Sequence, residues 1–416
     1  MSAEIRTITE SEVKEWTQTT LTGFLTPPVV TDEDVAQKVK YTDLSRCQGA
    51  FDTDTGRCVA TFRSFAQQLT VPGGATVTAT AVSGVGVVPT HRRQGLLSRM
   101  MAADLTAAKA RGEAVATLIA AEYPIYGRYG FGVATSLAEW EIDVPRTGLD
   151  PRHTVSLAGG RIDLTDAAGA REAGPVVHEK LRARQPGVTD RDDRWWSLAT
   201  GLERVSYHQF KEPFFAVHRN ADGEPEGLAV YHADDKWTDA KTPDNTLTVR
   251  DLIAATPAAE RALWHFLCSV DWVRKVRTGY RAPDDLLTGV LPNQRAASIV
   301  TSADWLWLRL LDVVRALEAR TYEGRGVLVL DVADPAGLAG GRFRLDATGE
   351  RAVCAPTTDE PDLALGAGEL ASLYLGDASP VRLATLGRIE ERTAGAAALA
   401  EAVFRTARRP WSPDIF

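Results

Sequence analysis

The sequence predicts a mixed α+β protein built from three units. Its length of 416 residues is too great for one hydrophobic core, since domains hold roughly 100–200 residues. Three β-rich runs between residues 49 and 88 precede a glycine-led helix and another strand, which is the order of an α/β unit. The same order returns more faintly between about 150 and 300. We therefore expect two related α/β units and a third of α+β type, bounded at 1–148, 149–300 and 301–416.

The first unit opens with a short strand, EIRTI, and continues with polar-capped helical stretches from Ser11 to about Lys40. The turn signals DTDTG and PGG then divide residues 49–88 into three antiparallel strands joined by hairpins. The apolar spacing of LLSRMMAADLTAAKARG predicts a helix that Gly112 terminates. The strand AVATLIA follows this helix, and the unit ends near Val144.

The second unit contains the hairpin AVHRNADGEPEGLAVYHA, the strand NTLTVRDLIA and the helix AAERALWHFLCSVDW. Its strand-to-helix turn, AATPAAER, has no glycine and no paired arginines, so we expect no phosphate site there. The third unit is expected to open with DWLWLRL and the helix LLDVVRALEAR. The strands GVLVLDV, GRFRLDA and AVCAP follow, and the chain finishes in an apolar tail, RRPWSPDIF.

Composition and motifs exclude several classes of function. The chain carries 55 acidic against 47 basic residues, a net charge of −8, which argues against a nucleic-acid-binding protein and mildly favours cationic ligands. The four cysteines lie far apart, and the polar N-terminus and lack of long apolar runs predict a cytoplasmic protein without a membrane span. A calcium-loop-like DTDTG has Arg63 where the bidentate Glu belongs, and His178-Glu179 is followed by Arg182 in place of a second histidine. We therefore expect no metal.

One segment, VGVVPTHRRQGLLS, combines a strand, two arginines, a glycine and a helix start. A helix N-terminus leaves free N–H groups that bind phosphate, a glycine permits close approach of the backbone, and arginines add charge-assisted hydrogen bonds. Pro89 ends the strand, so its N–H groups near Val85 and Val87 are candidates for pairing with an extended ligand. Pyrophosphate on the loop and an amide-bearing arm along the strand describe coenzyme A. The alternative is a solvated basic helix start.

The segment TAVSGVGVVPTHRRQGLLSRMM resembles the acetyl-CoA loop of the GCN5-related N-acetyltransferases (GNAT), and specifically of their Eis family (enhanced intracellular survival). The superfamily pattern ends in Gly or Ala where this chain has Leu97, which favours the Eis subset. The segments YPIYGRYGFG and DWLWLRLLDVVRALEAR and the terminal Phe416 also resemble that family. The resemblance implies two GNAT-fold domains, of which only the first is catalytic, and a sterol-carrier-protein-like third domain. It also implies a homohexamer and transfer of acetyl groups from acetyl-CoA to amines of aminoglycosides or protein lysines.

The resemblance also assigns roles to residues. Three tyrosines recur in AEYPIYGRYGFG, and the residues themselves select none of them. The family motif I-Y-G-R aligns on Tyr126, which would be the general acid, while Tyr123 and Tyr129 are expected to pack. The α-carboxylate of Phe416 would be the general base. The expected acetyl-CoA contacts are Val85, Gly86, Val87, Arg92, Arg93, Gln94, Gly95, Leu96, Leu97, Ser98, Ala121 and Glu122.

Alternatives remain open at this stage. A non-catalytic acyl-CoA sensor or scaffold would keep the loop and process no amine, and a lysine acetyltransferase with one protein target would ignore drugs. An acidic residue is expected just before the terminal aromatic in aminoglycoside-acetylating relatives, but this chain has Ile415 there and Asp414 one position earlier. The run Asp32-Glu33-Asp34 either lines a pocket for cations or caps a helix.

Overall fold

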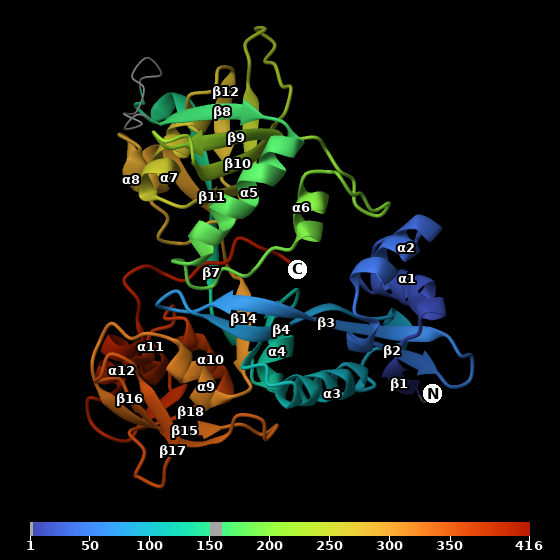
Figure 1. Cartoon of the computed structure of the whole chain (residues 1–416), viewed down its shortest axis with the longest axis vertical. Coiled ribbons are helices and arrows are strands. Elements are labelled where there is room, and N and C mark those ends of the chain that lie inside the picture. Colours follow the sequence, from blue (N-terminus) through green and yellow to red (C-terminus); the bar gives the residue numbers. More distant parts are fainter. Residues whose placement is uncertain (1–2, 150–159) are drawn as a thin grey trace.

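Three sheets organise the computed structural model, which describes residues 3–149 and 160–416 (Figure 1). Two sheets have seven strands each and the third has five. We call the first sheet with its helices the first lobe, the second sheet with its helices the second lobe, and the third the C-terminal domain. The helices described here include none that is long and apolar enough to cross a membrane.

The first lobe has the strand order β1-β2-β3-β4-β5-β14-β6. Its strands are β1 (Ala3–Thr7), β2 (Cys47–Asp52), β3 (Cys58–Thr70), β4 (Thr76–Val87), β5 (Val115–Ile119), β6 (Gly132–Val133) and β14 (Leu306–Leu310). Its helices are α1 (Val13–Gly23), α2 (Asp32–Tyr41), α3 (Leu96–Ala110) and the short α4 (Tyr123–Tyr126). Strands β2, β3 and β4 are antiparallel, which confirms the three strands expected between residues 49 and 88, and β5 runs parallel to β4.

The second lobe has the order β13-β7-β12-β11-β10-β9-β8. Its strands are β7 (Ser136–Asp143), β8 (Arg161–Thr165), β9 (Phe214–Arg219), β10 (Pro225–Ala233), β11 (Asn245–Ala254), β12 (Val273–Arg277) and β13 (Ala297–Asp304). Its helices are α5 (Ala167–Arg182), α6 (Asp193–Ala199), α7 (Pro257–Cys268) and α8 (Leu287–Val290). Strand β11 is parallel to β12 and antiparallel to β10, so the order and directions repeat those of the first lobe.

The two lobes exchange one strand each. Strand β7 follows β6 in the chain but lies between β12 and β13, and β14 follows β13 but lies between β5 and β6. The sheets therefore depart from the predicted boundaries 1–148, 149–300 and 301–416 at these two strands. The physical reason is that both strands carry buried apolar side chains and pair on both edges, and each finds its two neighbours in the other lobe. The segment Leu306–Leu310 was expected to open the third unit, but it is buried in the sheet of the first lobe.

The C-terminal domain packs helices on a small mixed sheet. Its strands are β15 (Val327–Ala333), β16 (Gly341–Asp346), β17 (Val353–Pro356), β18 (Leu363–Gly366) and β19 (Ile389–Glu391). Its helices are α9 (Val313–Ala319), α10 (Ala367–Tyr374), α11 (Pro380–Thr385) and α12 (Ala396–Phe404). After α12 the chain leaves this domain and ends between the two lobes, near α6 and the strands β3 and β4 (Figure 1).

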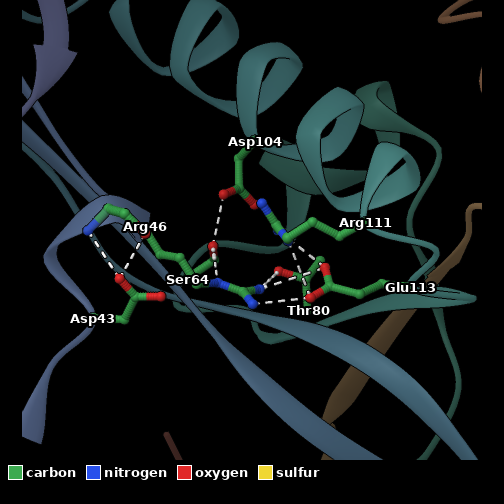
Figure 2. A network of polar contacts seen from close by, with 8 residues as sticks. Asp43, Arg46, Ser64, Thr80, Asp104, Arg111 and Glu113 are labelled. Atoms are coloured by element: carbon green, nitrogen blue, oxygen red, sulfur yellow. Dashed lines mark hydrogen bonds and ion pairs between the residues drawn. The ribbon is translucent and has the colours of Figure 1, made fainter.

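A buried polar network fixes α3 to the first sheet (Figure 2). Arg46 donates to Glu113 at 2.9 Å and to Thr80 at 2.7 Å, and Ser64 on β3 donates to Asp104 on α3 at 2.6 Å. Burial raises the pKa of Asp104. Because buried polar groups are costly unless they are paired, this network holds the helix in one position over the strands.

The two sequence motifs that partly match metal-binding patterns, DTDTG and His178-Glu179, belong to a hairpin turn and to a helix. The Asp52 side chain accepts from the backbone N–H groups of Asp54 and Thr55 in the hairpin turn between β2 and β3. His178 is buried within α5, where desolvation strongly lowers its pKa. In residues 3–149 and 160–416, no group of His, Cys, Asp and Glu side chains is arranged to hold a metal ion.

Candidate active site

The first lobe opens along one edge of β4. Strands β4 and β5 are paired from Ala79–Val115 to Ala81–Thr117, after which β4 continues to Val87 without a partner on that side. The register of β3 and β4 shifts between Arg63 and Thr61, which leaves Gly84 and Val85 in a bulge. Gly84 has φ +58°, a conformation that favours glycine. The backbone between the bulge and Val87 is therefore available to an extended ligand.

The loop beyond β4 ends at the N-terminus of α3. Arg93 has φ +64° and Gly95, at the N-cap, has φ +74°, so the chain turns sharply before the helix. No side chain caps α3, which leaves its first N–H groups without a side-chain acceptor. Arg92, Arg93, Gln94, Gly95 and Ser98 are exposed around this helix start. The structure thus places an uncapped helix start behind the loop, as expected from the sequence, a geometry that can accept a phosphate.

The three tyrosines of the segment after β5 have different surroundings. Tyr126 is only 8% exposed, and no group in the described part of the chain forms a hydrogen bond with its hydroxyl. Burial, with smaller contributions from Tyr129 and Glu122, raises the pKa of Tyr126 to about 12. Tyr123 lies with its ring 5.0 Å from that of Trp307, and the Tyr129 hydroxyl is 2.8 Å from Ser98 Oγ on α3. Only Tyr126 combines burial with a free hydroxyl.

The predicted cofactor contacts other than the exposed residues at the helix start fall into three groups. One apolar cluster of the first lobe brings together the end of β4, the start of α3 and the tyrosine; it includes Val85, Val87, Leu96, Leu97 and Tyr126. Gly86 is buried in β4 opposite Thr61. Ala121 and Glu122 are exposed in the connection between β5 and α4. All of these groups border the edge of β4 or the helix start.

Phe416 lies on the other face of the same sheet. Its ring contacts that of Phe65 on β3 edge-on, with centroids 5.7 Å apart. Ser64 points toward α3, so the adjacent Phe65 points to the opposite face, and Phe65 is paired with Ala81, the last β4 residue with a partner on β5. The tyrosine and the chain end are therefore on opposite faces of the sheet, beside the place where β4 and β5 separate.

The tail that carries Phe416 is firmly held. The Trp411 N–H donates to the Pro186 carbonyl at 2.9 Å, and the Trp305 indole donates to the Asp414 carbonyl at 3.0 Å. Arg191, which is buried, binds Asp414 at 2.9 Å and Asp251 at 2.7 Å. Ile415 is exposed. An apolar tail was expected to dock, and the structure confirms it.

The acidic run at the start of α2 serves the helix. The Asp34 carboxylate accepts from the N–H and hydroxyl of Thr31 at 2.8 Å, which forms a capping box, and also from Ser206 of the second lobe. These hydrogen bonds lower the pKa of Asp34 to about 2, even though burial raises it. Asp32 pairs with Lys14 at the surface. Of the two readings of this run, the helix cap is confirmed for Asp34.

Sequence reasoning missed Phe65, which contacts the docked Phe416, and the Arg63 guanidinium over the Phe65 ring. It also missed Lys38 of α2 and Arg194 of α6, which come near Arg63 only in the folded chain. The period-2 pattern of β3 could have placed Arg63 and Phe65 on one face, but nothing in the sequence indicated which face the tail would reach.

Comparison with known proteins gives matches along nearly the whole chain. Residues 4–134 and 187–315 each match an acetyltransferase (GNAT) domain, and residues 313–413 match a sterol carrier protein domain. The third match begins at Val313 and the second continues through β14, which agrees with the burial of that strand in the lobes.

Several relatives are described as N-acetyltransferases. One from Streptomyces avermitilis is 60% identical over 413 residues, covering 99% of this chain and 98% of its own. N-acetyltransferase Eis of Mycobacterium tuberculosis is 34% identical over 331 residues, covering 78% of this chain and 77% of its own. The crystal structure of Eis1 from Mycobacterium abscessus superposes over the full length of both chains with a TM-score of 0.86 and 30% identity.

Proposed function

The chain belongs to the Eis family of GNAT N-acetyltransferases, and from that premise we propose that it transfers acetyl from acetyl-CoA to an amine by direct attack in a ternary complex. The observation that carries the proposal is the open edge of β4 leading into the uncapped start of α3. The cytoplasmic homohexamer implied by the family resemblance belongs to the same proposal.

The residues present fit acetyl-CoA. A Cβ built on Gly95 meets no protein atom within 4 Å, so the space above the helix start is open to a phosphate. Arg92 and Arg93 are exposed beside it and would supply charge-assisted hydrogen bonds. The bulge at Gly84 and Val85 would face the thioester end, where a strand N–H near Val85 would polarise the carbonyl oxygen. When bound, acetyl-CoA supplies an activated acyl carbon.

Tyr126 is proposed as the general acid. As the C–N bond forms and the C–S bond breaks, its hydroxyl gives a proton to the departing sulfur. With its pKa raised to about 12 the hydroxyl is fully protonated at neutral pH. A free thiol has a pKa of about 8.5, so proton transfer from Tyr126 to such a thiolate is uphill by about 5 kcal/mol, a cost that hydrogen bonding and a raised pKa of the buried sulfur would have to offset.

The Phe416 carboxylate is proposed as the general base that takes the proton of the acceptor ammonium. An α-carboxyl pKa near 3.5 and an amine pKa near 10.4 differ by about 9 kcal/mol, so direct transfer between unperturbed groups would be slow. Burial can raise the carboxyl pKa, a water can relay the proton, or a crowded polyamine can arrive partly neutral.

Thiol release from acetyl-CoA tests the proposal, with aminoglycosides, polyamines and lysine peptides as acceptors. Tyr126→Phe and deletion of Phe416 should each reduce kcat by about 10²–10⁴-fold, the usual contribution of general acid–base catalysis, while acetyl-CoA binding persists. Unchanged turnover in both variants would contradict the assigned roles. Binding of acetyl-CoA without turnover of any amine would favour the sensor or scaffold, and kanamycin offered beside a histone-like peptide separates a drug acetyltransferase from a lysine acetyltransferase.

A further inference from the structure

Three cations from three elements lie around the face of the first sheet on which Phe416 docks. Lys38 comes from α2, Arg63 from β3 and Arg194 from α6. Each lies over an aromatic ring: Lys38 Nζ is 4.8 Å from the centre of Trp16, Arg63 Cζ is 5.0 Å from that of Phe65, and Arg194 Cζ is 4.7 Å from that of Tyr41. We call these three side chains the cation cluster.

The cation cluster borders the acyl end of the proposed site. A Cβ placed on Gly84, in the bulge of β4, would lie 3.5 Å from the Trp16 ring and 3.7 Å from Arg63 Cβ. Phe65, below the Arg63 guanidinium, is the residue that contacts Phe416. The bulge of β4, the cation cluster and the end of the chain at Phe416 therefore lie in one region of the molecule.

Contacts between the lobes bring Arg194 to this region. The Tyr41 hydroxyl donates to Glu203, and the Ser206 N–H donates to Asp34 at 2.9 Å, so α2 is joined to the second lobe. Arg194 then covers the Tyr41 ring from α6. Figure 1 shows the chain end between α6 and the strands β3 and β4.

No carboxylate compensates the cluster. In the part of the chain that the structure describes, none of the three cations is within 4.0 Å of a carboxylate oxygen, the Phe416 carboxylate included. Asp34 accepts from Ser206 and Thr31, and one oxygen of Glu203 accepts from Tyr41 while the other, Oε2, is buried without a partner. Arg194 Nε is buried and has no hydrogen-bond partner. Burial and mutual repulsion lower the pKa values of Lys38, to about 8, and of Arg63.

We propose that the acceptor amine carries an anionic group, a carboxylate or a phosphate, which the cation cluster binds. This inference rests on the proposed acetyl transfer and defines the class of its acceptor. Ion pairs between the anionic group and the two arginines, Arg63 and Arg194, would give the Arg194 Nε–H an acceptor and orient the amine toward the bulge of β4. Polycationic acceptors meet like charge in the same place, which is unfavourable. The local charge is thus opposite to the net charge of −8.

Amines that differ only in their distal group test this proposal. 6-Aminohexanoate, hexylamine and 1,6-diaminohexane form one series, and O-phosphoethanolamine against ethanolamine distinguishes phosphate from carboxylate. Binding is measured by calorimetry on the full chain saturated with coenzyme A, and turnover by thiol release from acetyl-CoA. We expect the anionic amines to bind roughly tenfold tighter than their neutral or cationic partners, the usual effect of one charge-assisted hydrogen bond.

Variants locate the anion site. Arg63→Gln and, independently on the other lobe, Arg194→Gln should abolish the preference, and Arg63→Lys should retain part of it because the charge remains. Arg274→Gln is the matched control, since Arg274 is exposed on β12. Acetyl-CoA affinity verifies that each variant is folded.

The two proposals fail in different ways. Tighter binding of the diamine, or no binding of any anionic amine, overturns the anion site, and thiol release with cationic amines would then leave acetyl transfer standing. Binding of anionic amines that depends on Arg63, without thiol release from any amine, supports the anion site and contradicts acetyl transfer.

Discussion

The two lobes have the same strand order but differ at the place where their central pair of parallel strands ends. In each, a parallel pair ends while the longer strand continues: β4 beyond Ala81, and β11 from Thr248 to Ala254. In the first lobe the edge is left free. In the second, the buried Arg281 donates to the Leu252 carbonyl at 2.5 Å and lies over the ring of Trp411 from the tail. In the second lobe, Arg281 and Trp411 of the tail occupy the part of the opening next to Leu252, while a cavity of about 830 Å³ remains beside Thr248 and Arg250.

The helix starts differ in the same sense. Thr256 caps α7 by accepting from the Ala259 N–H, Pro257 follows, and Glu260 adds a negative charge in the first turn. Helix α3 begins after Gly95 with no cap and no acidic residue in its first turn. Since phosphate needs free N–H groups and positive potential, only α3 suits it. Topology alone therefore does not make a GNAT-fold lobe a cofactor site; the side chains at the opening decide.

The largest expected effect is the loss of stability when Arg281 of the second lobe is replaced. Arg281 binds Glu260 at 2.9 Å and Asp285 at 2.7 Å, and all three are buried. Arg281→Met removes the cation and leaves both carboxylates uncompensated, which should lower the free energy of unfolding by about 3–5 kcal/mol. Urea unfolding followed by tryptophan fluorescence measures it, because the Trp264 ring lies 5.4 Å from the guanidinium.

Arg277→Met is the control for that experiment. Arg277 belongs to the same lobe but is exposed and pairs with Glu141 at 3.2 Å, so its loss should change stability by about 0.5 kcal/mol or less. Acetyl-CoA affinity should be the same in both variants. A weaker affinity in Arg281→Met would contradict the idea that the second lobe takes no part in binding.

The next effect concerns the open helix start of the first lobe. Gly95→Ala should raise the Kd for acetyl-CoA about tenfold, because the new Cβ occupies space in which only a ligand lies, and should cost about 1–2 kcal/mol of stability because φ is positive. Gly56→Ala is a matched control: its φ is +71° and its Cβ also meets nothing within 4 Å, but it lies in the β2–β3 hairpin. Equal Kd values in the two variants would contradict a phosphate site at Gly95.

A smaller effect is expected at the cap of α7. Thr256→Ala should lower the free energy of unfolding by about 1 kcal/mol, since one N–H of the first turn loses its acceptor. Thr256→Ser should retain most of the stability because the hydroxyl remains. Thermal unfolding measures both. If Thr256→Ala did not change the free energy of unfolding, the side-chain cap of α7 would not contribute to stability, and the difference from the uncapped α3 would have no energetic meaning.

Features set by neighbouring residues, such as turns and helix starts, could be predicted from the sequence, but contacts between distant segments could not. The turns DTDTG and PGG correctly divided β2, β3 and β4, and Gly95 with its arginines marked the start of α3. The exchange of β7 and β14 could not be predicted, because the pattern of buried residues in a strand does not indicate which sheet the strand joins. Strand β14 pairs with β5 across almost two hundred intervening residues. The cation cluster is hidden for the same reason: Lys38, Arg63 and Arg194 look like ordinary surface charges until the lobes meet.

A pH-dependent effect contrasts the buried cations of the two lobes, since Arg281 is paired with two carboxylates and Lys38 with none. With a pKa of about 8 in the folded protein and 10.5 when unperturbed, Lys38 is charged in both states below pH 8, where its burial destabilises the fold. Between these values only the unfolded state keeps the proton, so stability rises with pH. Lys38→Met should therefore raise the Tm at pH 7, and this advantage should shrink toward pH 10. Lys14→Met, at an exposed site, should show no such trend. A Tm advantage that did not change with pH would mean that Lys38 contributes through packing and that its charge is already compensated.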